Sequence, residues 1–525
     1  MNLIKPFIVL IIASIIFAGS FINQEISLDS ELIIKPLEAV DSLSDYFQLF
    51  KDGKIADFQP IRDLFHMVDI KIASLTGFKK TSLFTNFLIF LTTTYALFQF
   101  FNCFFTEKLS YIGILLFSVH PIIVHVYTDP AQKKHILSLL FLLLTLKFIN
   151  KKREPIKALM SYILLLCSQP INALIPAYYF LLVEKNNFKD RKKLLIFSGY
   201  GAILVFFLAI NFSIYGIFEP QIKQAIPDLD LLNLVGSIGL FLRQIFFPIW
   251  FSTYYDISNN INFVFAGIGL LIVFTLLLTK KTEIFKFILP IFLIFLTLYG
   301  IKSNVYNLYF YNSYLLTPLS FSICIFLSFL DRFPYKKVCS LSYLLALLFF
   351  CISLFYSSKR TNKYDLYTYQ VTIEANCRQM EWLTVEAIKR AYTEDVYSYS
   401  RWWIKNDCAP VYNQYTFYFI QAHYVVENLQ ISTAHKLKYI DDIFSLELDR
   451  ILLKSIVLKR ENKTDELINE LKKLNQFEYN SIFLENSYII KEVISVVKDL
   501  KLKNKILNYV AQINKKPIKF AVKKL

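Results

Sequence analysis

The chain has 525 residues, of which 55% are hydrophobic and 17% aromatic, with 51 Phe, 33 Tyr and only 12 Gly. A soluble domain cannot bury that apolar fraction, and several apolar runs exceed the roughly 18 residues that cross a bilayer. The net charge of +16 does not indicate nucleic-acid binding, because many Lys and Arg stand in tight clusters between apolar runs. Composition therefore predicts an all-α polytopic membrane protein.

The apolar runs predict eleven membrane-spanning helices. In chain order these are 4–21, 83–104, 109–127, 134–149, 157–168, 171–184, 193–214, 262–279, 285–301, 308–330 and 338–357. They define a transmembrane domain over 1–357. The first run also has an alternative interpretation as a cleaved signal peptide, with Ala18-Gly19-Ser20 as a small-residue site.

The basic clusters predict the orientation. One cluster lies at 151–157 and another at 185–193, on either side of two short runs that Ser168-Gln169-Pro170 separates. Cytoplasmic loops are enriched in Lys and Arg, so both clusters belong on the cytoplasmic side and the chain crosses twice between them. One long kinked span is the competing interpretation. The N-terminus is then cytoplasmic, in a bacterial inner or plasma membrane, and 22–80 and 358–525 are extracytoplasmic.

The first extracytoplasmic loop, 22–80, contains a predicted amphipathic helix. Arg62, His66 and Asp69 occupy one face. Apolar residues at helical spacing form another: Ile61, Leu64, Phe65, Val68 and Ile72. This pattern is typical of an interfacial helix lying on a membrane, although a helix that merely covers the bundle fits it as well.

Two further regions lie outside the spans. The run 231–250 is apolar but contains Arg243, and both its ends must face outward, so we expect a re-entrant or surface-lying helix. The pattern over 358–525 predicts an extracytoplasmic helical domain. It shows no clean repeat, so any tetratricopeptide-like repeats there are degenerate. Its two cysteines, Cys377 and Cys408, are the candidates for a disulfide on the oxidising side.

Ionisable residues gather at the predicted outer ends of the spans. His120 and His125 end the third run, Asp29 follows the first, and a second group opens the fourth: Asp129, Lys133, Lys134 and His135. Ionisable groups at membrane depth are costly and are functional candidates by default. Lysines there suit a lipid-linked phosphate, and a carboxylate beside them suits a general base acting on a hydroxyl.

Four segments, in order, resemble the GT-C membrane glycosyltransferases, and most closely the TMTC-type, dolichyl- or polyprenyl-phosphate-mannose-dependent protein O-mannosyltransferases and their bacterial tetratricopeptide-repeat relatives. The resemblance covers about residues 1–360. The segments are Phe58-Gln59-Pro60-Ile61-Arg62-Asp63-Leu64 with Gly77 and Asn86; Leu116-Phe117-Ser118-Val119-His120-Pro121-Ile122 with Lys133-Lys134-His135; Ser168-Gln169-Pro170 with Pro176; and Phe241-Leu242-Arg243-Gln244 through Pro248 to Tyr254.

The resemblance implies a GT-C-like bundle that transfers a sugar from a polyprenyl-phosphate donor to a hydroxyl of a protein or glycan, with inversion. It implies Asp29 and Glu31 as the catalytic acids. It also implies that the donor phosphate is bound by four residues: Arg62, Lys133, Lys134 and His120. Three further residues would support this site: His125, His135 and Arg243. A divalent cation, Mg or Mn, is an optional cofactor, and the metal ligands are unknown.

The chain departs from the family pattern at three places. Asp29-Ser30-Glu31 supplies only one acid directly, Gln59 replaces an Arg, and His125 stands where an acid is usual. Alternatives therefore stay open: a lipid-linked glycan polymerase or oligosaccharide ligase, a transporter or flippase, and a non-catalytic scaffold or pseudoenzyme. The expected partners are the lipid-linked sugar, its acceptor and the bilayer, and no nucleic acid.

Overall fold

A computed structural model describes the chain in segments. They are 4–21, 28–51, 58–150, 154–183, 191–215, 231–246, 254–256, 264–269, 309–311, 316–331, 335–360, 362–373, 377–390, 432–443 and 447–473, with a few single residues between them. The chain divides into two compact units, Met1–Glu374 and Ala375–Leu525. The predicted boundary at 358 falls earlier, because the helix Lys363–Ile373 belongs to the first unit.

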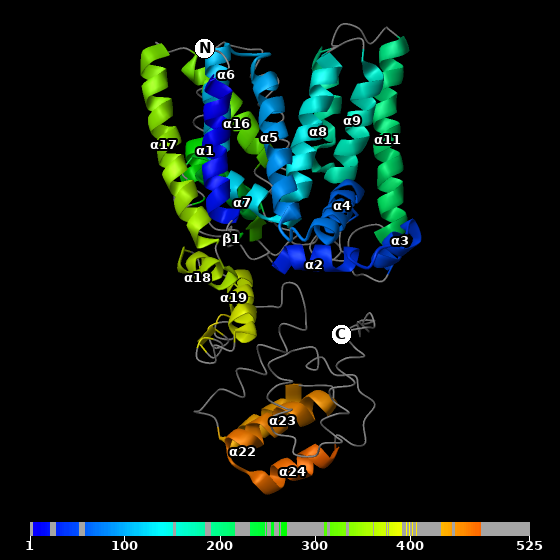
Figure 1. Cartoon of the computed structure of the whole chain (residues 1–525), viewed down its shortest axis with the longest axis vertical. Helices are drawn as coiled ribbons and strands as arrows, with labels where there is room; N and C mark the ends of the chain where they lie inside the picture. Colours follow the sequence, from blue (N-terminus) through cyan, green and yellow to red (C-terminus); the bar gives the residue numbers. More distant parts are fainter. Residues whose placement is uncertain are drawn as a thin grey trace. The chain divides into compact units, whose positions relative to one another are not determined.

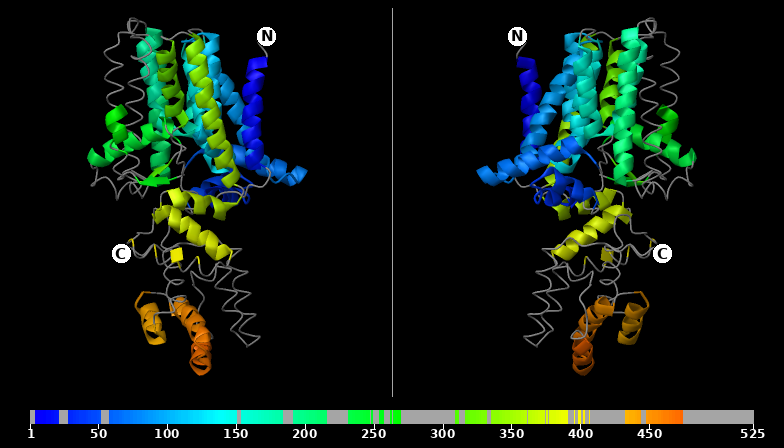
Figure 2. Two further views of the ribbon diagram at one scale, coloured as in Figure 1. Left: turned by 90° about the vertical axis from the view of Figure 1, so that its left-hand side faces the viewer. Right: turned by 90° about the vertical axis from the view of Figure 1, so that its right-hand side faces the viewer.

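Long helices of the first unit lie side by side (Figures 1 and 2). They are α1 (Ile4–Phe21), α5 (Thr81–Phe101), α6 (Glu107–Val119), α8 (Lys133–Asn150), α9 (Pro155–Ser168), α10 (Leu174–Val183), α11 (Arg191–Tyr215), α16 (Leu316–Leu330) and α17 (Tyr335–Lys359). The core is apolar and aromatic: Phe17, for example, stacks on Phe87 at 4.2 Å between ring centroids. Helix α8 packs against α5 and α9, and α17 packs against α1 and α6.

Most of these helices coincide with the predicted spans to within a few residues, because an uninterrupted apolar run satisfies every backbone group within one helix. The third predicted span, 109–127, differs. It is broken into α6 and α7 (Pro121–Thr128), bent by 62°. His120 between them has extended backbone angles, φ −69° and ψ 134°, as expected of a residue before proline.

Three helices of the segment between α1 and α5 lie across one end of the bundle, the lower end in Figure 1: α2 (Leu28–Leu37), α3 (Leu43–Lys51) and α4 (Pro60–Thr76). They share a small apolar core of Leu37, Tyr46 and Leu49, against which Met67 and Ile70 of α4 pack. Helix α2 also packs against the short 3-10 helix η1 (Pro130–Gln132). The loop is therefore a folded layer beside the start of α8.

Helix α4 has its polar face buried and its apolar face exposed. Arg62, Asp63, His66 and Asp69 are at most 3% exposed. A stripe of apolar residues at helical spacing is 39–80% exposed: Leu64, Val68, Ile72 and Leu75. In water this arrangement would be unfavourable, since it leaves the apolar face hydrated. It suits a helix whose outer face meets lipid, the arrangement that the sequence pattern predicts.

The described residues are mostly helical, but they also include one pair of strands. β1 (Tyr254–Asp256) pairs antiparallel with β2 (Tyr309–Tyr311). The predicted span 308–330 therefore begins as a strand, since aromatic side chains favour strands, and its helix α16 starts only at Leu316. Helix α13 (Leu231–Phe246) occupies the run that contains Arg243. The predicted span 285–301 and most of 262–279 lie outside the described residues.

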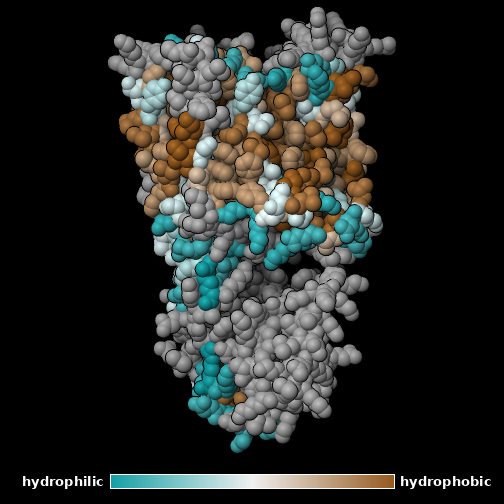
Figure 3. Space-filling model, viewed as in Figure 1, coloured by the Kyte–Doolittle hydropathy of each residue, from teal (hydrophilic) through white to brown (hydrophobic). Residues whose placement is uncertain are grey.

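Within the described part of the chain, two helices are long and apolar enough to cross a membrane: α5, and α17 over Cys339–Lys359. The bent pair α6–α7 adds a third if it forms one span. Figure 3 shows a band of apolar side chains around the middle of the helical bundle, with polar residues towards the end that carries α2 and α4. These features are consistent with a membrane protein.

The second unit contains α19 (Cys377–Lys389), α22 (Thr433–Ile443), α23 (Glu447–Arg460) and α24 (Thr464–Lys473). Helix α23 packs against both α22 and α24, and its Ile451, Ile456 and Val457 are buried. Cys377 is disulfide-bonded. Cys408, the expected partner, lies outside the described residues. The five cysteines of the first unit are free.

Candidate functional site

The candidate site is built on the buried polar face of α4 and on the turn between α7 and α8. Pro60 at the first position of α4 and Gly77 in the left-handed conformation after it (φ 71°) fix the ends of the helix. Its four buried charged or titratable side chains need partners, since an unpaired charge in the interior is costly. Most of these partners lie on other elements of the first unit, namely α3, α5 and α8.

Arg62 and Asp63 form a tight buried pair. Both Nε and Nη2 of Arg62 donate to Oδ1 of Asp63 at 2.7 Å, and neither side chain is exposed. The other carboxylate oxygen of Asp63 accepts a hydrogen bond of 2.7 Å from the Tyr46 hydroxyl of α3. Arg62, expected to hold a donor phosphate, is thus engaged with a carboxylate that also fastens α3 to α4.

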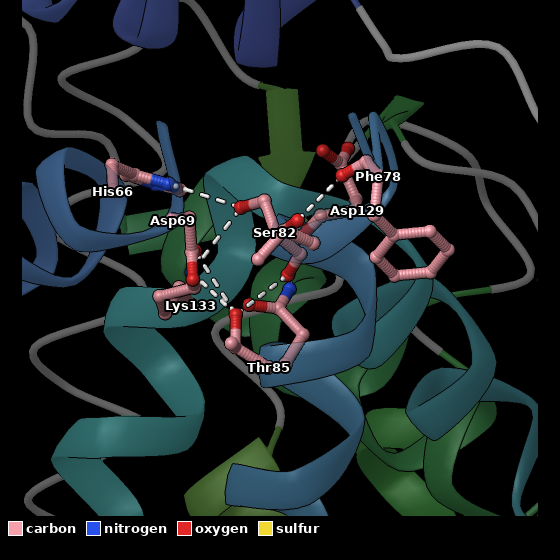
Figure 4. Close-up of polar contacts among 9 residues, drawn as sticks. His66, Asp69, Phe78, Ser82, Thr85, Asp129 and Lys133 are labelled. Atoms are coloured by element: carbon pink, nitrogen blue, oxygen red, sulfur yellow. Dashed lines mark hydrogen bonds and ion pairs between the residues drawn. The ribbon is translucent and has the colours of Figure 1, made fainter. Parts of the chain in front are cut away.

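Lys133, the first residue of α8, is saturated (Figure 4). Its ammonium pairs with Asp69 of α4 in a short contact. It also donates to Ser82 Oγ at 3.2 Å and to Thr85 Oγ1 at 3.1 Å, both on α5. A lysine has three N–H donors, so all of them have partners within the protein. A phosphate could bind here only by displacing one of these groups.

His66 completes this cluster. Its Nδ1 lies 3.2 Å from Ser82 Oγ, and its ring is buried. Burial lowers the pKa of His66 well below its usual range, and the nearby charges of Lys133 and Arg62 lower that pKa further. His66 is therefore neutral at pH 7. Lys133, Asp69, Ser82, Thr85 and His66 together join α4, α5 and α8.

A third buried charge pair is loose. Arg360 follows the last residue of α17 and is 3% exposed. Its Nη1 donates to His125 Nδ1 at 2.8 Å and more weakly to the Tyr356 hydroxyl at 3.4 Å. Its Nη2 is 4.0 Å from Asp129 Oδ2, which is beyond hydrogen-bond distance. Arginine never accepts a hydrogen bond, so the proton of a neutral His125 must lie on its Nε2.

Arg360 therefore has donors to spare. Among the described residues its Nε has no hydrogen-bond partner although it is buried. The hydroxyl of Tyr127, two residues before Asp129, is also buried, has no hydrogen-bond partner in the described part of the chain and lies within electrostatic range of Arg360. Arg360 is not among the site residues that the sequence predicts. It lies far from Asp129 along the chain, and only the packing of α17 against α7 unites them.

The other predicted residues lie around these pairs. His120 caps α7 by accepting from Ile122 N at 3.3 Å, and its Nε2 lies 3.0 Å from the Ile245 carbonyl of α13. Arg243 of α13 donates to Asn262 at 3.4 Å. Lys134 is half-buried and His135 buried, both in the first turn of α8. His120 and Arg243 are thus seen in bonds that hold the bundle together.

Asp29 and Glu31 lie in the first turn of α2, and their side chains are outside the described part of the structure. The packing of α2 against η1 brings their helix beside the turn that Asp129 caps. No group of three or more His, Cys, Asp or Glu in the described residues could hold a metal ion. The residues seen therefore do not define a Mg or Mn site, and no step below depends on one.

A second polar group, without charges, lies at a helix break. Gln59, at the start of α4, donates to Gln169 Oε1 at 2.9 Å. Gln169 follows α9, and its backbone carbonyl accepts from Ser138 of α8 at 3.2 Å. Asn172, in the 3-10 helix η2 (Pro170–Asn172), donates to Ser138 at 2.7 Å and to Thr317 of α16 at 3.2 Å.

No family model, no curated protein and no solved structure matches the chain.

Proposed function

We propose that this protein is a GT-C-type membrane glycosyltransferase that moves a sugar from a polyprenyl-phosphate donor to an acceptor hydroxyl outside the cytoplasm. The observation that carries the proposal is the loose pair of Arg360 and Asp129. A guanidinium buried with unused donors suits a phosphate, which accepts charge-assisted hydrogen bonds from two of its N–H groups at once. The resemblance of the four sequence segments supplies the class of reaction.

The position of this pair supports a lipid-linked ligand. Arg360 ends the apolar helix α17, and Asp129 lies at the turn before α8, at the end of the bundle that carries α2 and α4 (Figure 1). The exposed apolar stripe of α4 suits the lipid surface at the same end. A donor with its prenyl chain in the bilayer would present its phosphate at this depth.

The reaction would be one direct displacement. Asp29 takes the proton of the acceptor hydroxyl, and the acceptor oxygen forms a bond to the anomeric carbon while the bond from that carbon to the phosphate oxygen breaks. Polyprenyl phosphate leaves with the electron pair, and Arg360 stabilises its added negative charge. His125 holds Arg360 in place through Nδ1. Attack opposite the leaving group inverts the anomeric centre.

The proposed role of Lys133 and Arg62 is narrower than the sequence suggests. In the structure they contact carboxylates and hydroxyls of the protein, so we assign them to the support of α4. Lys134 at the start of α8 stays a proposed contact of the donor, whereas His120, whose two ring nitrogens both have partners in the protein, is assigned to the support of α7. Asp29 stays the proposed base, since α2 packs beside η1.

The membrane topology is part of the proposal. We place eleven spans, a cytoplasmic N-terminus and an extracytoplasmic second unit that recognises the acceptor. In support, the last turn of α8 and the first turns of α9, α11 and α17, which adjoin Lys- and Arg-rich segments, lie at the same end of the bundle as the start of α1 (Figure 1). The disulfide of Cys377 fits an oxidising compartment.

The test is transfer of a radiolabelled hexose from polyprenyl-phosphate hexoses in membranes that contain the protein. Asp29→Asn should abolish transfer, and Arg360→Gln should reduce it about 100-fold, as expected for loss of a donor to developing charge. Asp41→Asn in the same loop and Lys359→Gln beside Arg360 are the matched controls, and both should keep wild-type rates. Full transfer by well-expressed Asp29→Asn and Arg360→Gln variants would overturn the proposal.

The same assay distinguishes the proposed transferase from the alternative enzyme class. A glycan polymerase or oligosaccharide ligase would move a chain of sugars, whereas the proposed enzyme moves one. The mass of the product therefore decides between them.

A further inference from the structure

The five uncharged residues Gln59, Ser138, Gln169, Asn172 and Thr317, here called the amide cluster, have hydrogen-bonding capacity that the protein does not use. Gln59 Oε1 and Asn172 Oδ1 are buried and have no partner within the described part of the chain. The side-chain oxygen of Gln169 accepts from Gln59, and no hydrogen bond from the Gln169 side-chain nitrogen is seen among the described residues. Each buried unpaired polar atom costs about 1–3 kcal/mol, so native proteins rarely leave several together without a ligand or water.

The chemistry of the unused atoms narrows the ligand class. An anion would need donors alone, and a cation would need acceptors alone. The amide cluster offers both, namely the two carbonyl oxygens and the Gln169 nitrogen. Exchanging the oxygen and nitrogen of any of these amides changes which atom is unused but leaves the mixture. A hydroxyl group is both donor and acceptor, so a compound with several hydroxyls fits the cluster.

The backbone around the cluster is also of the kind that surrounds ligands. Gln59 precedes the first turn of α4, and Gln169 and Asn172 lie where the chain leaves α9 and enters η2. Irregular backbone inside a helical membrane bundle is tolerated where it is buried in protein or lines a cavity. Asn172 and Gln169 are 2% and 4% exposed, so the break is enclosed within the bundle.

We propose that the amide cluster binds the hydroxyl groups of a sugar ring. That the sugar arrives attached to a polyprenyl phosphate rests on the function proposed above, whereas the recognition of hydroxyls rests on the amide cluster alone. Arg360 and the amide cluster would then divide the donor, one taking the phosphate and the other the sugar.

The experiment measures binding to the full-length protein in lipid nanodiscs. The probes are bare polyprenyl phosphate, polyprenyl phosphates that carry glucose, mannose or galactose, and the free methyl glycosides of these hexoses. The wild type should bind at least one hexosyl lipid about tenfold more tightly than the bare lipid, the effect of one or two hydrogen bonds. In Asn172→Leu this ratio should fall to about one, while the affinity for the bare lipid stays unchanged and reports an intact fold.

Ser138→Ala is the second variant, for use if Asn172→Leu fails to fold, and it should lower the same ratio. Thr145→Val is its matched control, because the Thr145 hydroxyl, also on α8, bonds only within its own helix, to Phe141 O at 2.7 Å. The control should keep the wild-type ratio.

The outcomes separate the two proposals. A ratio that persists in both Asn172→Leu and Ser138→Ala overturns the sugar site. So does a wild type that shows no preference for any hexosyl lipid and binds no methyl glycoside, which would mean that only water fills the cluster. If no polyprenyl lipid binds, the proposed transferase fails. Saturation transfer to a methyl glycoside then decides: a signal that Asn172→Leu abolishes supports the sugar site, and no such signal overturns it.

Discussion

Two buried charged regions at the same end of the bundle differ in how fully their charges are paired. Lys133 uses all three donors on Asp69, Ser82 and Thr85. Arg360 has one short hydrogen bond, to His125, and its carboxylate partner Asp129 is 4.0 Å away. A basic group whose N–H donors all have partners in the protein has no donor left for a ligand. A basic group with unused donors gains hydrogen bonds when a ligand binds. We infer that a buried basic residue indicates a binding site only when some of its N–H donors have no partner in the protein.

The largest expected effect concerns the stability of the saturated region. Lys133→Met leaves Asp69 buried without its counter-charge and should lower the free energy of unfolding by about 3–5 kcal/mol. The double variant Lys133→Met with Asp69→Leu removes both charges and should recover most of that loss. Thermal denaturation of the detergent-solubilised protein measures both. A Lys133→Met protein as stable as wild type would show that this pair does not support the fold.

A smaller effect is expected at the other tight pair. Tyr46→Phe removes the hydroxyl that donates to Asp63 at 2.7 Å but keeps the ring in the small core with Leu37 and Leu49. Loss of a hydrogen bond to a charged group should cost about 1.5–3 kcal/mol. Ser44→Ala, at an exposed position of the same helix α3, is the control and should change stability by less than about 0.5 kcal/mol. Equal stability of Tyr46→Phe and wild type would contradict the assignment.

The smallest of the stability effects depends on pH. His66 is neutral when folded, because its pKa is lowered from the ordinary 6.5. Below that value the unfolded chain takes up a proton that the folded protein does not, so stability falls as pH falls. Between pH 6.5 and 5.5 the loss should be about 1 kcal/mol, because the unfolded histidine is already half protonated at pH 6.5. His66→Gln should reduce this slope, and denaturation at a series of pH values checks it. An identical slope in the variant would exclude His66 as its source.

Much of the fold could be predicted from residue patterns. Long apolar runs predicted the positions of α1, α5, α8 and α17, because a lipid-buried backbone must satisfy its own hydrogen bonds. The two faces of α4 followed from spacing alone. The bend at His120 could have been predicted as well, since Pro121 disfavours a helical residue before it.

The pairing of charges could not be predicted. Lys133 and Arg360 both stand at the end of an apolar helix, and nothing near either residue in the sequence shows which of them has hydrogen-bond partners for all its donors and which has not. That difference comes from packing between distant segments: α4 and α5 supply the partners of Lys133, and α7 and η1 those of Arg360. The charged residues in the sequence indicate the region of the candidate site. Only the tertiary structure shows which of these residues has donors that a ligand could use.

The affinity for bare polyprenyl phosphate in nanodiscs tests the central claim most directly, with Arg360→Gln, its neighbour Lys359→Gln and the wild type compared side by side. The claim predicts about 10- to 100-fold weaker binding for Arg360→Gln, which is the loss of one or two charge-assisted hydrogen bonds, and unchanged binding for Lys359→Gln. Equal affinity of Arg360→Gln and wild type, with both proteins folded, would contradict it.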